Sequence, residues 1–219
     1  MTTGCHPAGA CCPPEDSYLR PFAALTEQRW DDHRFYHHNR MNQALHLLSA
    51  LAFLTVYGLL FLSPALAVLL AWLVAMPSRQ IGHFFFEPHE YDHVNDASHE
   101  HKEAIKVGYN LFRKIVLLTI WALSPLLLAA SPSLWGLLSP AASFAHLADN
   151  VAMIWLAIAV GAVLFRTLQL FVIRDVQTGL VWCTKILTDP FHDVKLYHRA
   201  PLQVLRGELY EPAVLEPRA

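Results

Sequence analysis

The stretch LHLLSALAFLTVYGLLFLSPALAVLLAWLVAMPS, from Leu45 to Ser78, decides the fold, because it contains no Asp, Glu, Lys or Arg. At about 1.5 Å per residue, one helix of this length would reach about 51 Å, against a hydrocarbon core of about 30 Å. Ser63-Pro64 divides the stretch near its middle, and proline favours the start of a helix. The sequence therefore predicts two membrane spans, at 45–62 and 65–82, joined by a tight turn.

Two later uncharged runs predict two more spans. One is expected at 114–130, with a kink near Ser124-Pro125. The other is expected at 150–172 and contains Arg166, which must face the bundle or reach the membrane interface. The predicted fold class is an all-α integral membrane protein with about four transmembrane helices.

The composition of the chain agrees with a membrane protein and excludes two other classes. Hydrophobic residues make up 54% of the 219 residues and charged residues only 16%, whereas a soluble domain carries about 25% charged residues. A net charge of −2 argues against a nucleic-acid partner, which would require a basic face. The high hydrophobicity excludes intrinsic disorder. The expected partners are the membrane and its lipids, and no particular oligomeric state is predicted.

Basic residues indicate the orientation. All 16 Lys and Arg residues fall on one side of the four predicted spans, and the connections around 63–64 and 131–149 contain none. The positive-inside rule then places both termini in the cytoplasm. The membrane would be the inner membrane in a bacterium or the endoplasmic reticulum in a eukaryote.

The spans divide the chain into three regions. Residues 1–30 lack an early apolar core and predict a flexible cytosolic leader. Residues 31–175 are expected to form the transmembrane domain, including a histidine-rich cytoplasmic loop at 83–110. Residues 176–219 are expected to form a tail at the cytoplasmic membrane interface.

Histidine is the unusual residue of this chain, which contains 13, and eleven of them fall at the predicted cytoplasmic face. His46 precedes the Pro64 turn by 18 residues and His83 follows it by 19, so antiparallel helices place both at one depth. Packed helices lie about 8–10 Å apart, which allows two imidazoles to share an ion. Imidazole and carboxylate ligands suit iron, zinc, manganese or copper. We therefore predict a metal centre at this face.

Two segments carry a resemblance to a known family. YHHNRMNQALH (36–46) and RQIGHFFFE (79–87) resemble the small membrane family of 2-hydroxy-fatty-acid α-dioxygenases, known from fungal endoplasmic reticulum. That family shows a His, an Asn five residues later and a His four further, then a hairpin that ends in Gln-x-Gly-His-x-x-x-Glu. The resemblance covers about residues 30–130. The matching positions are His37, Asn42, His46, Gln80, Gly82, His83 and Glu87.

The resemblance implies an iron(II) enzyme that adds dioxygen to a 2-hydroxy fatty acid and releases a chain shortened by one carbon. It implies that Asn42 and Gln80 hold the substrate or the ligand shell by hydrogen bonds. Glu87 would be either a ligand or the partner that orients an imidazole. One Fe(2+) ion is expected, with two as the alternative. The implied metal ligands are His37, His46 and His83.

The chain departs from the family in a segment after Glu87, PHEYDHVNDASHEHKE, and in an added tail, TDPFHDVKLYHRAP. In the tail, His192 and Asp193 are candidates to cap the site, unless a helix simply begins after Pro190. A second metal position would make the protein a di-iron hydroxylase or desaturase, which is the alternative function. A metal transporter or assembly protein is the non-enzymatic alternative. The lesser ligand candidates are His38, His89, His93, His99, His101 and His192.

His37 and His38 are alternative first ligands. On an unbroken helix His38 would share a face with His46, whereas His37 would lie about 180° away from it. The spacing in the family favours His37. We therefore expect the helix to begin after His37, with the break near Asn39 or Arg40.

Overall fold

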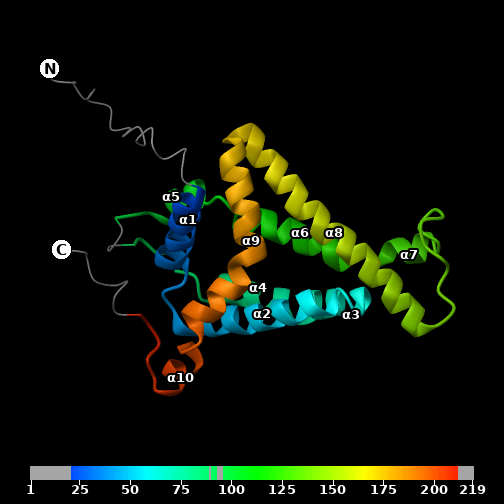
Figure 1. Ribbon diagram of the computed structural model, residues 1–219, viewed down its shortest axis with the longest axis horizontal. Helices are drawn as coiled ribbons and strands as arrows, with labels where there is room; N and C mark the ends of the chain where they lie inside the picture. Colours follow the sequence, from blue (N-terminus) through cyan, green and yellow to red (C-terminus); the bar gives the residue numbers. More distant parts are fainter. Residues whose placement is uncertain (1–20, 89, 93–95, 212–219) are drawn as a thin grey trace.

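The computed structural model describes residues 21–88, 90–92 and 96–211, and these residues form helices joined by short connections (Figure 1). The predicted all-α fold class is confirmed, because four helices are long and apolar enough to cross a membrane. Their bounds are Arg40–Leu59, Pro64–Phe85, Phe112–Ala130 and Phe144–Ile173.

The first hairpin forms as predicted. α2 (Arg40–Leu59) begins after Asn39, whose side chain accepts a hydrogen bond of 2.8 Å from the Met41 amide. α3 (Pro64–Leu70) begins at the predicted proline, with Ser63 as its N-cap. Both the turn at Ser63-Pro64 and the helix break after His37 are therefore confirmed.

The second span is one continuous path of three pieces: α3, a π-helical turn η2 (Ala71–Ala75) and α4 (Met76–Phe85). Pro77 explains the π-helical turn, because proline lacks an amide hydrogen and its ring crowds the carbonyl four residues earlier. Ser78 Oγ donates to the carbonyls of Val74 (2.8 Å) and Ala75 (3.0 Å), which provides partners for this disturbed turn.

The third span is broken where the sequence predicts. α6 (Leu111–Leu123) and α7 (Leu126–Ala130) are separated by Ser124-Pro125. α8 (Phe144–Ile173) then crosses back along a diagonal in Figure 1 and packs on α3. Three tryptophans, Trp72, Trp121 and Trp155, form a cluster with ring centroids 5.3–6.5 Å apart, in which Trp72 and Trp121 are stacked and Trp155 is tilted against both.

Two regions differ from the sequence-based expectation. α1 (Pro21–Tyr36) is helical, so the prediction of a flexible leader is wrong for residues 21–30; residues 1–20 lie outside the described part. α9 (Val176–Tyr197) begins at the Asp175 cap and continues through Pro190, so the predicted helix start there is wrong.

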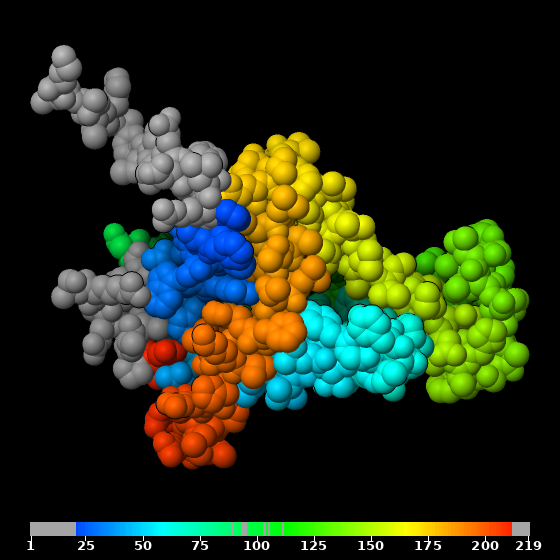
Figure 2. All heavy atoms as spheres, viewed as in Figure 1, coloured from blue at the N-terminus to red at the C-terminus, as the bar shows by residue number. Residues whose placement is uncertain are grey.

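The predicted interfacial tail, residues 176–219, contains helices that pack against the other helices. α9 packs along α2 and also contacts α1 and α8, while the short α10 (Ala200–Leu205) contacts α2. Figure 2 shows the orange α9 beside the blue α1, with α10 below them, at the end of the molecule opposite α7. The sequence after residue 175 therefore builds part of the helical bundle.

Buried charges tie α9 to α1 and α4. Lys185 Nζ lies 2.5 Å from Asp32 Oδ2 and 2.7 Å from Asp189 Oδ2. Arg29 Nε lies 3.1 Å from Asp189 Oδ1, and Arg79 Nη1 of α4 lies 3.2 Å from Asp193 Oδ2. Burial alone would lower the pKa of Lys185, but the two carboxylates beside it raise that pKa well above its usual value. α1, α4 and α9 are thus joined by ion pairs.

Candidate metal centre

Three histidines from separate segments meet at the end of the first hairpin. His37 lies between α1 and α2, His46 lies in the second turn of α2, and His83 lies in α4. One ring nitrogen from each lies within 4.8 Å of the others, which is close enough to hold one metal ion. The ring centroids of His37 and His46 are 4.1 Å apart, and those of His46 and His83 are 4.9 Å apart.

Side chains of α2 hold the chain in the turn that contains His37. Asn42 Nδ2 donates to the Tyr36 carbonyl (2.8 Å), and Gln43 Nε2 donates to the His37 carbonyl (2.8 Å). These bonds satisfy carbonyls at the end of α1 that have no partner within the helix. The break turns His37 toward His46, so the helical phase that favoured His38 does not apply. His38 is buried nearby but is not a member of the cluster.

The Nδ1 atom of each imidazole in the cluster faces a different polar side chain. His37 Nδ1 lies 2.9 Å from Tyr197 Oη, and His83 Nδ1 contacts Glu87 Oε1. His46 Nδ1 lies 3.7 Å from Asp193 Oδ2, a charge contact rather than a hydrogen bond. Such outer partners orient metal-binding imidazoles and leave Nε2 as the ligand atom.

The Nε2 atoms fit a metal ion. Those of His37 and His46 are buried and have no hydrogen-bond partner. An unsatisfied buried polar atom costs about 1–3 kcal/mol, and a metal ion at the centre of the cluster would remove that cost. Burial, followed by the neighbouring His46 and His83, holds the pKa of His37 well below its usual value. His37 is therefore neutral at pH 7, which is the form that binds metals.

Tyr197 joins the cluster to another buried histidine, His33. If Nε2 of His37 is the ligand atom, its Nδ1–H donates to Tyr197 Oη. The tyrosine hydroxyl then donates to His33 Nδ1 (3.2 Å), and His33 Nε2 lies 3.5 Å from Glu211 Oε2. Burial raises the pKa of Tyr197 well above its usual value, so this hydroxyl keeps its proton. The direction of each hydrogen bond is thus fixed from one end to the other.

Gly82 explains the close approach of α2 and α4. A Cβ atom at this position would lie 2.3 Å from Asn42 Oδ1 and 3.4 Å from His46 Cδ2. Asn42 is fully buried, and its amide nitrogen already binds a backbone carbonyl, so it positions the turn around His37. Gln80 Oε1 is buried without a hydrogen-bond partner. Glu87 contacts His83 with one oxygen and lies 3.5 Å from Lys106 Nζ with the other, which favours an orienting role.

The lesser candidates that the structure describes lie outside the cluster. His99 and His101 belong to α5 (His99–Ile105), and His192 is half-buried on α9. His89 and His93 lie outside the described residues. Within the described part of the chain, the group of three or more His, Cys, Asp or Glu residues whose ligand atoms lie close together consists of His37, His46 and His83.

Sequence reasoning included Asp193 but missed Tyr197 and His33 as parts of the site. Asp193 and Tyr197 are four residues apart, so they share one face of α9. Helical spacing from Asp193 was therefore the available signal for Tyr197.

Comparison of the chain with protein-family models, with curated proteins and with solved structures finds no match. The resemblance described above rests on seven positions of the two motifs. The basis for a function is thus the geometry of the buried imidazoles together with these motifs.

Proposed function

We propose that the protein is an iron-dependent membrane oxygenase of fatty acyl substrates, and that it shortens 2-hydroxy fatty acids by one carbon. The observation that carries this proposal is the cluster of three buried imidazoles at the end of a membrane hairpin, two with unpartnered Nε2 atoms. Three imidazoles also suit zinc, manganese or copper. The choice of iron and of substrate is supported by the motif resemblance.

The location of the cluster suits an amphipathic substrate. His46 and His83 lie near the ends of two membrane-spanning helices, so a carboxylate head group can reach the cluster while its acyl chain stays in the bilayer. The basic residues favour the cytoplasmic face as the location of this end, with both termini on the same side.

The proposed reaction needs no external reductant. R–CH(OH)–COOH and O2 give R–COOH, CO2 and H2O: the bond between C1 and C2 breaks, and C2 becomes the new carboxyl carbon. All the electrons that reduce dioxygen come from the substrate. When bound, iron(II) supplies the redox chemistry that lets dioxygen react with a closed-shell substrate. A hydroxylase or desaturase, in contrast, takes electrons from a separate donor.

The residues of the chain hold and orient the centre. His37, His46 and His83 would be the ligands, and Glu87 would fix the ring of His83. Tyr197 and Asp193 would do the same for His37 and His46 from α9. A 2-hydroxy carboxylate offers two oxygen atoms, which suits a metal with open coordination positions.

The test is a substrate panel. Protein purified in detergent and loaded with iron(II) is incubated under air with 2-hydroxy and unmodified fatty acids, and the product chain length is read by mass spectrometry. Loss of one carbon from the 2-hydroxy acids alone is the expected result. A new hydroxyl group or double bond, with about two irons per chain, would instead indicate the di-iron alternative.

A pair of histidine variants ties activity to the cluster. His83→Ala should lose both iron and turnover, because it removes a ligand and leaves Glu87 without its imidazole partner. His198→Ala is the matched control, since His198 is exposed at the end of α9. Full activity and full iron content in His83→Ala would refute this site.

A further inference from the structure

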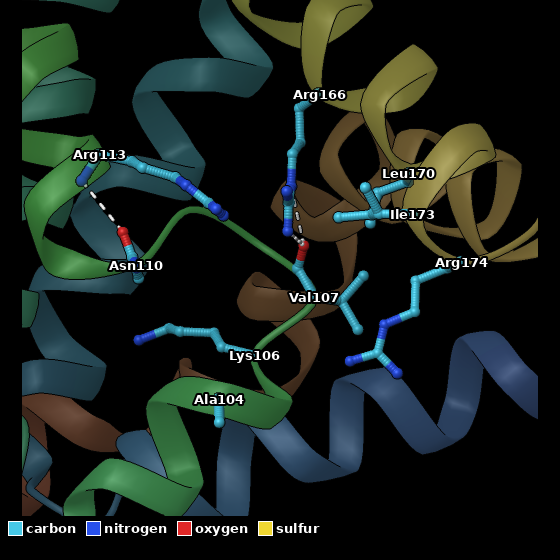
Figure 3. Close-up of a pocket in the computed structure, with 9 residues that line it drawn as sticks. All are labelled: Ala104, Lys106, Val107, Asn110, Arg113, Arg166, Leu170, Ile173 and Arg174. Atoms are coloured by element: carbon cyan, nitrogen blue, oxygen red, sulfur yellow. Dashed lines mark hydrogen bonds between the residues drawn. The ribbon is translucent and has the colours of Figure 1, made fainter.

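A pocket lies away from the histidine cluster, between the segment that precedes α6 and the last turns of α8. Its volume is about 240 Å³. Figure 3 shows it lined by nine residues, none of them acidic and none a member of the histidine cluster. Four of the lining residues are basic, namely Lys106, Arg113, Arg166 and Arg174.

Arg166 is the fixed part of this pocket. Its side chain is 2% exposed and donates from Nε and Nη2 to the Val107 carbonyl, at 3.1 and 2.6 Å. Nη2 also lies 3.2 Å from the Gly108 carbonyl, and Nη1 donates to Gln169 Oε1 at 2.6 Å. All these partners are neutral, and no ion pair is recorded for Arg166 within the described residues. A buried guanidinium without a carboxylate is a strong attractor for an anion.

Two further guanidinium groups extend into the same space. In Figure 3, the side chains of Arg113 from α6 and Arg174 from the end of α8 reach inward from opposite sides of Val107. Among the described residues, neither Arg113 nor Arg174 forms an ion pair. Lys106 contacts Glu87, so it is partly neutralised and contributes less. Among the described residues that line it, the pocket therefore presents three guanidinium groups and no carboxylate.

The remaining wall of the pocket is apolar and belongs to a membrane span. Leu170 and Ile173 lie in the last turns of α8, which is one of the four helices apolar enough to cross a bilayer. The pocket thus lies at the end of a candidate span, which is where such a helix would leave the hydrocarbon. Basic pockets between helices at this level suit anionic head groups, and the planar fork of arginine matches phosphate oxygens.

We propose that this arginine pocket, formed by Arg113, Arg166 and Arg174, binds the phosphate group of an anionic phospholipid. The phosphate lies among the guanidinium groups, and an acyl chain follows the apolar side of α8 past Ile173. The proposal does not depend on the metal centre or on the proposed oxygenase activity.

The test compares two double variants of the full chain that remove equal charge. Arg113→Gln with Arg174→Gln empties two sides of the pocket and spares the hydrogen bonds of Arg166. The control, Arg199→Gln with Arg206→Gln, changes exposed arginines at the two ends of α10. Binding is measured by calorimetry in neutral detergent with short-chain phosphatidic acid, with phosphatidylcholine of the same acyl chains, and with inorganic phosphate.

We expect the unmodified protein to prefer phosphatidic acid over phosphatidylcholine. The pocket variant should lose about tenfold or more in affinity, because it lacks charge-assisted hydrogen bonds to the phosphate. The control should stay within about twofold, because Arg199 and Arg206 do not line the pocket. Iron content and melting temperature should not change in either variant, which separates this result from failure of the metal centre or of the fold.

Other outcomes are equally clear. Equal losses in both double variants, or no loss in the pocket variant, would overturn the proposal. Inorganic phosphate that binds as tightly as phosphatidic acid would identify a free phosphate, rather than a lipid, as the natural source of the anion.

Discussion

Two ends of the bundle differ in the residues that they contain. The end with the histidine cluster buries polar and charged side chains, whereas the end with α7 exposes apolar ones. At the first, His46 is fully buried and lies beside Asp193, which itself pairs with Arg79. At the second, Trp135 is 73% exposed and Phe144 is 85% exposed, and no charged residue occurs between 131 and 148. The first end is built by α2, α4 and α9, and the second by α7, the loop after it and the start of α8.

The comparison separates surface that faces a membrane from surface built for a ligand. Exposed apolar residues at the α7 end match an apolar or interfacial environment and need no partner. Buried polar atoms at the histidine end are costly unless something binds them. Two of those atoms, His37 Nε2 and His46 Nε2, have no partner in the protein. This end is therefore the one that could hold a metal ion.

Among the charged residues, the largest expected effect on stability is the loss of Lys185. Lys185→Ala should destabilise the fold by about 3 kcal/mol, because Asp32 loses its cation, while Asp189 keeps its ion pair with Arg29. Unfolding in detergent with increasing denaturant measures the change. Lys195→Ala, an exposed position on the same helix, should have almost no effect. Equal stability of the two variants would mean that the ion pairs do not hold α9 in place.

Tyr197→Phe should weaken the metal centre while it preserves the fold. The change removes the hydroxyl that lies between His37 and His33, and outer partners of this kind contribute about 10–100-fold to metal affinity. Competition with a chelator gives the affinity. Tyr210→Phe, at an exposed tyrosine, is the control. An unchanged affinity would show that the hydroxyl does not orient the imidazole.

Asp175→Ala tests the corner between the membrane span α8 and α9. The Asp175 carboxylate accepts bonds of 2.7 Å from the Thr178 amide and 2.6 Å from its hydroxyl, and loss of such a cap costs about 1 kcal/mol. These bonds lower the pKa of Asp175, so its contribution is present above the unfolded pKa of about 3.9 and disappears as the pH falls through the folded pKa. Asp175→Asn should retain most of the stability at pH 7. A loss in Asp175→Ala that persists unchanged in acid would contradict this assignment.

Trp135→Ala should have the smallest effect, within about 0.5 kcal/mol, because the side chain is exposed in the loop after α7. Thermal unfolding in detergent measures it. Trp182→Ala, at a 4% exposed tryptophan of α9, should cost about 3–5 kcal/mol. Similar costs for both would remove the contrast between the two ends.

Features encoded by neighbouring residues could be predicted from the sequence. The turn at Ser63-Pro64, the kink at Ser124-Pro125 and the helix start after His37 each depend on local backbone chemistry, in which proline and capping side chains decide. The equal depth of His46 and His83 followed from helix geometry alone. These features were confirmed because no distant contact can change them.

Features that depend on distant contacts were not predictable in the same way. The apolar residues of α1 form no single stripe, and this helix is held through contacts such as that between Arg29 and Asp189. Spacing from Asp193 places Tyr197 on the same face of α9, but packing decides that this face meets α2 beside His37. Pro190 offered an alternative helix start, yet α9 continues through it, and its contacts with α1 and α2 offset the lost hydrogen bond.

The order of these parts along the chain has a consequence for biosynthesis. His46 and His83 are joined by the first hairpin and can meet once that hairpin has entered the bilayer, whereas Tyr197 follows His83 by 114 residues (197 − 83). An ion captured early would sit between imidazoles that still lack their tyrosine and Asp193 neighbours. Tyr197 and Asp193 would thus contribute to holding such an ion only after α9 has docked beside α2.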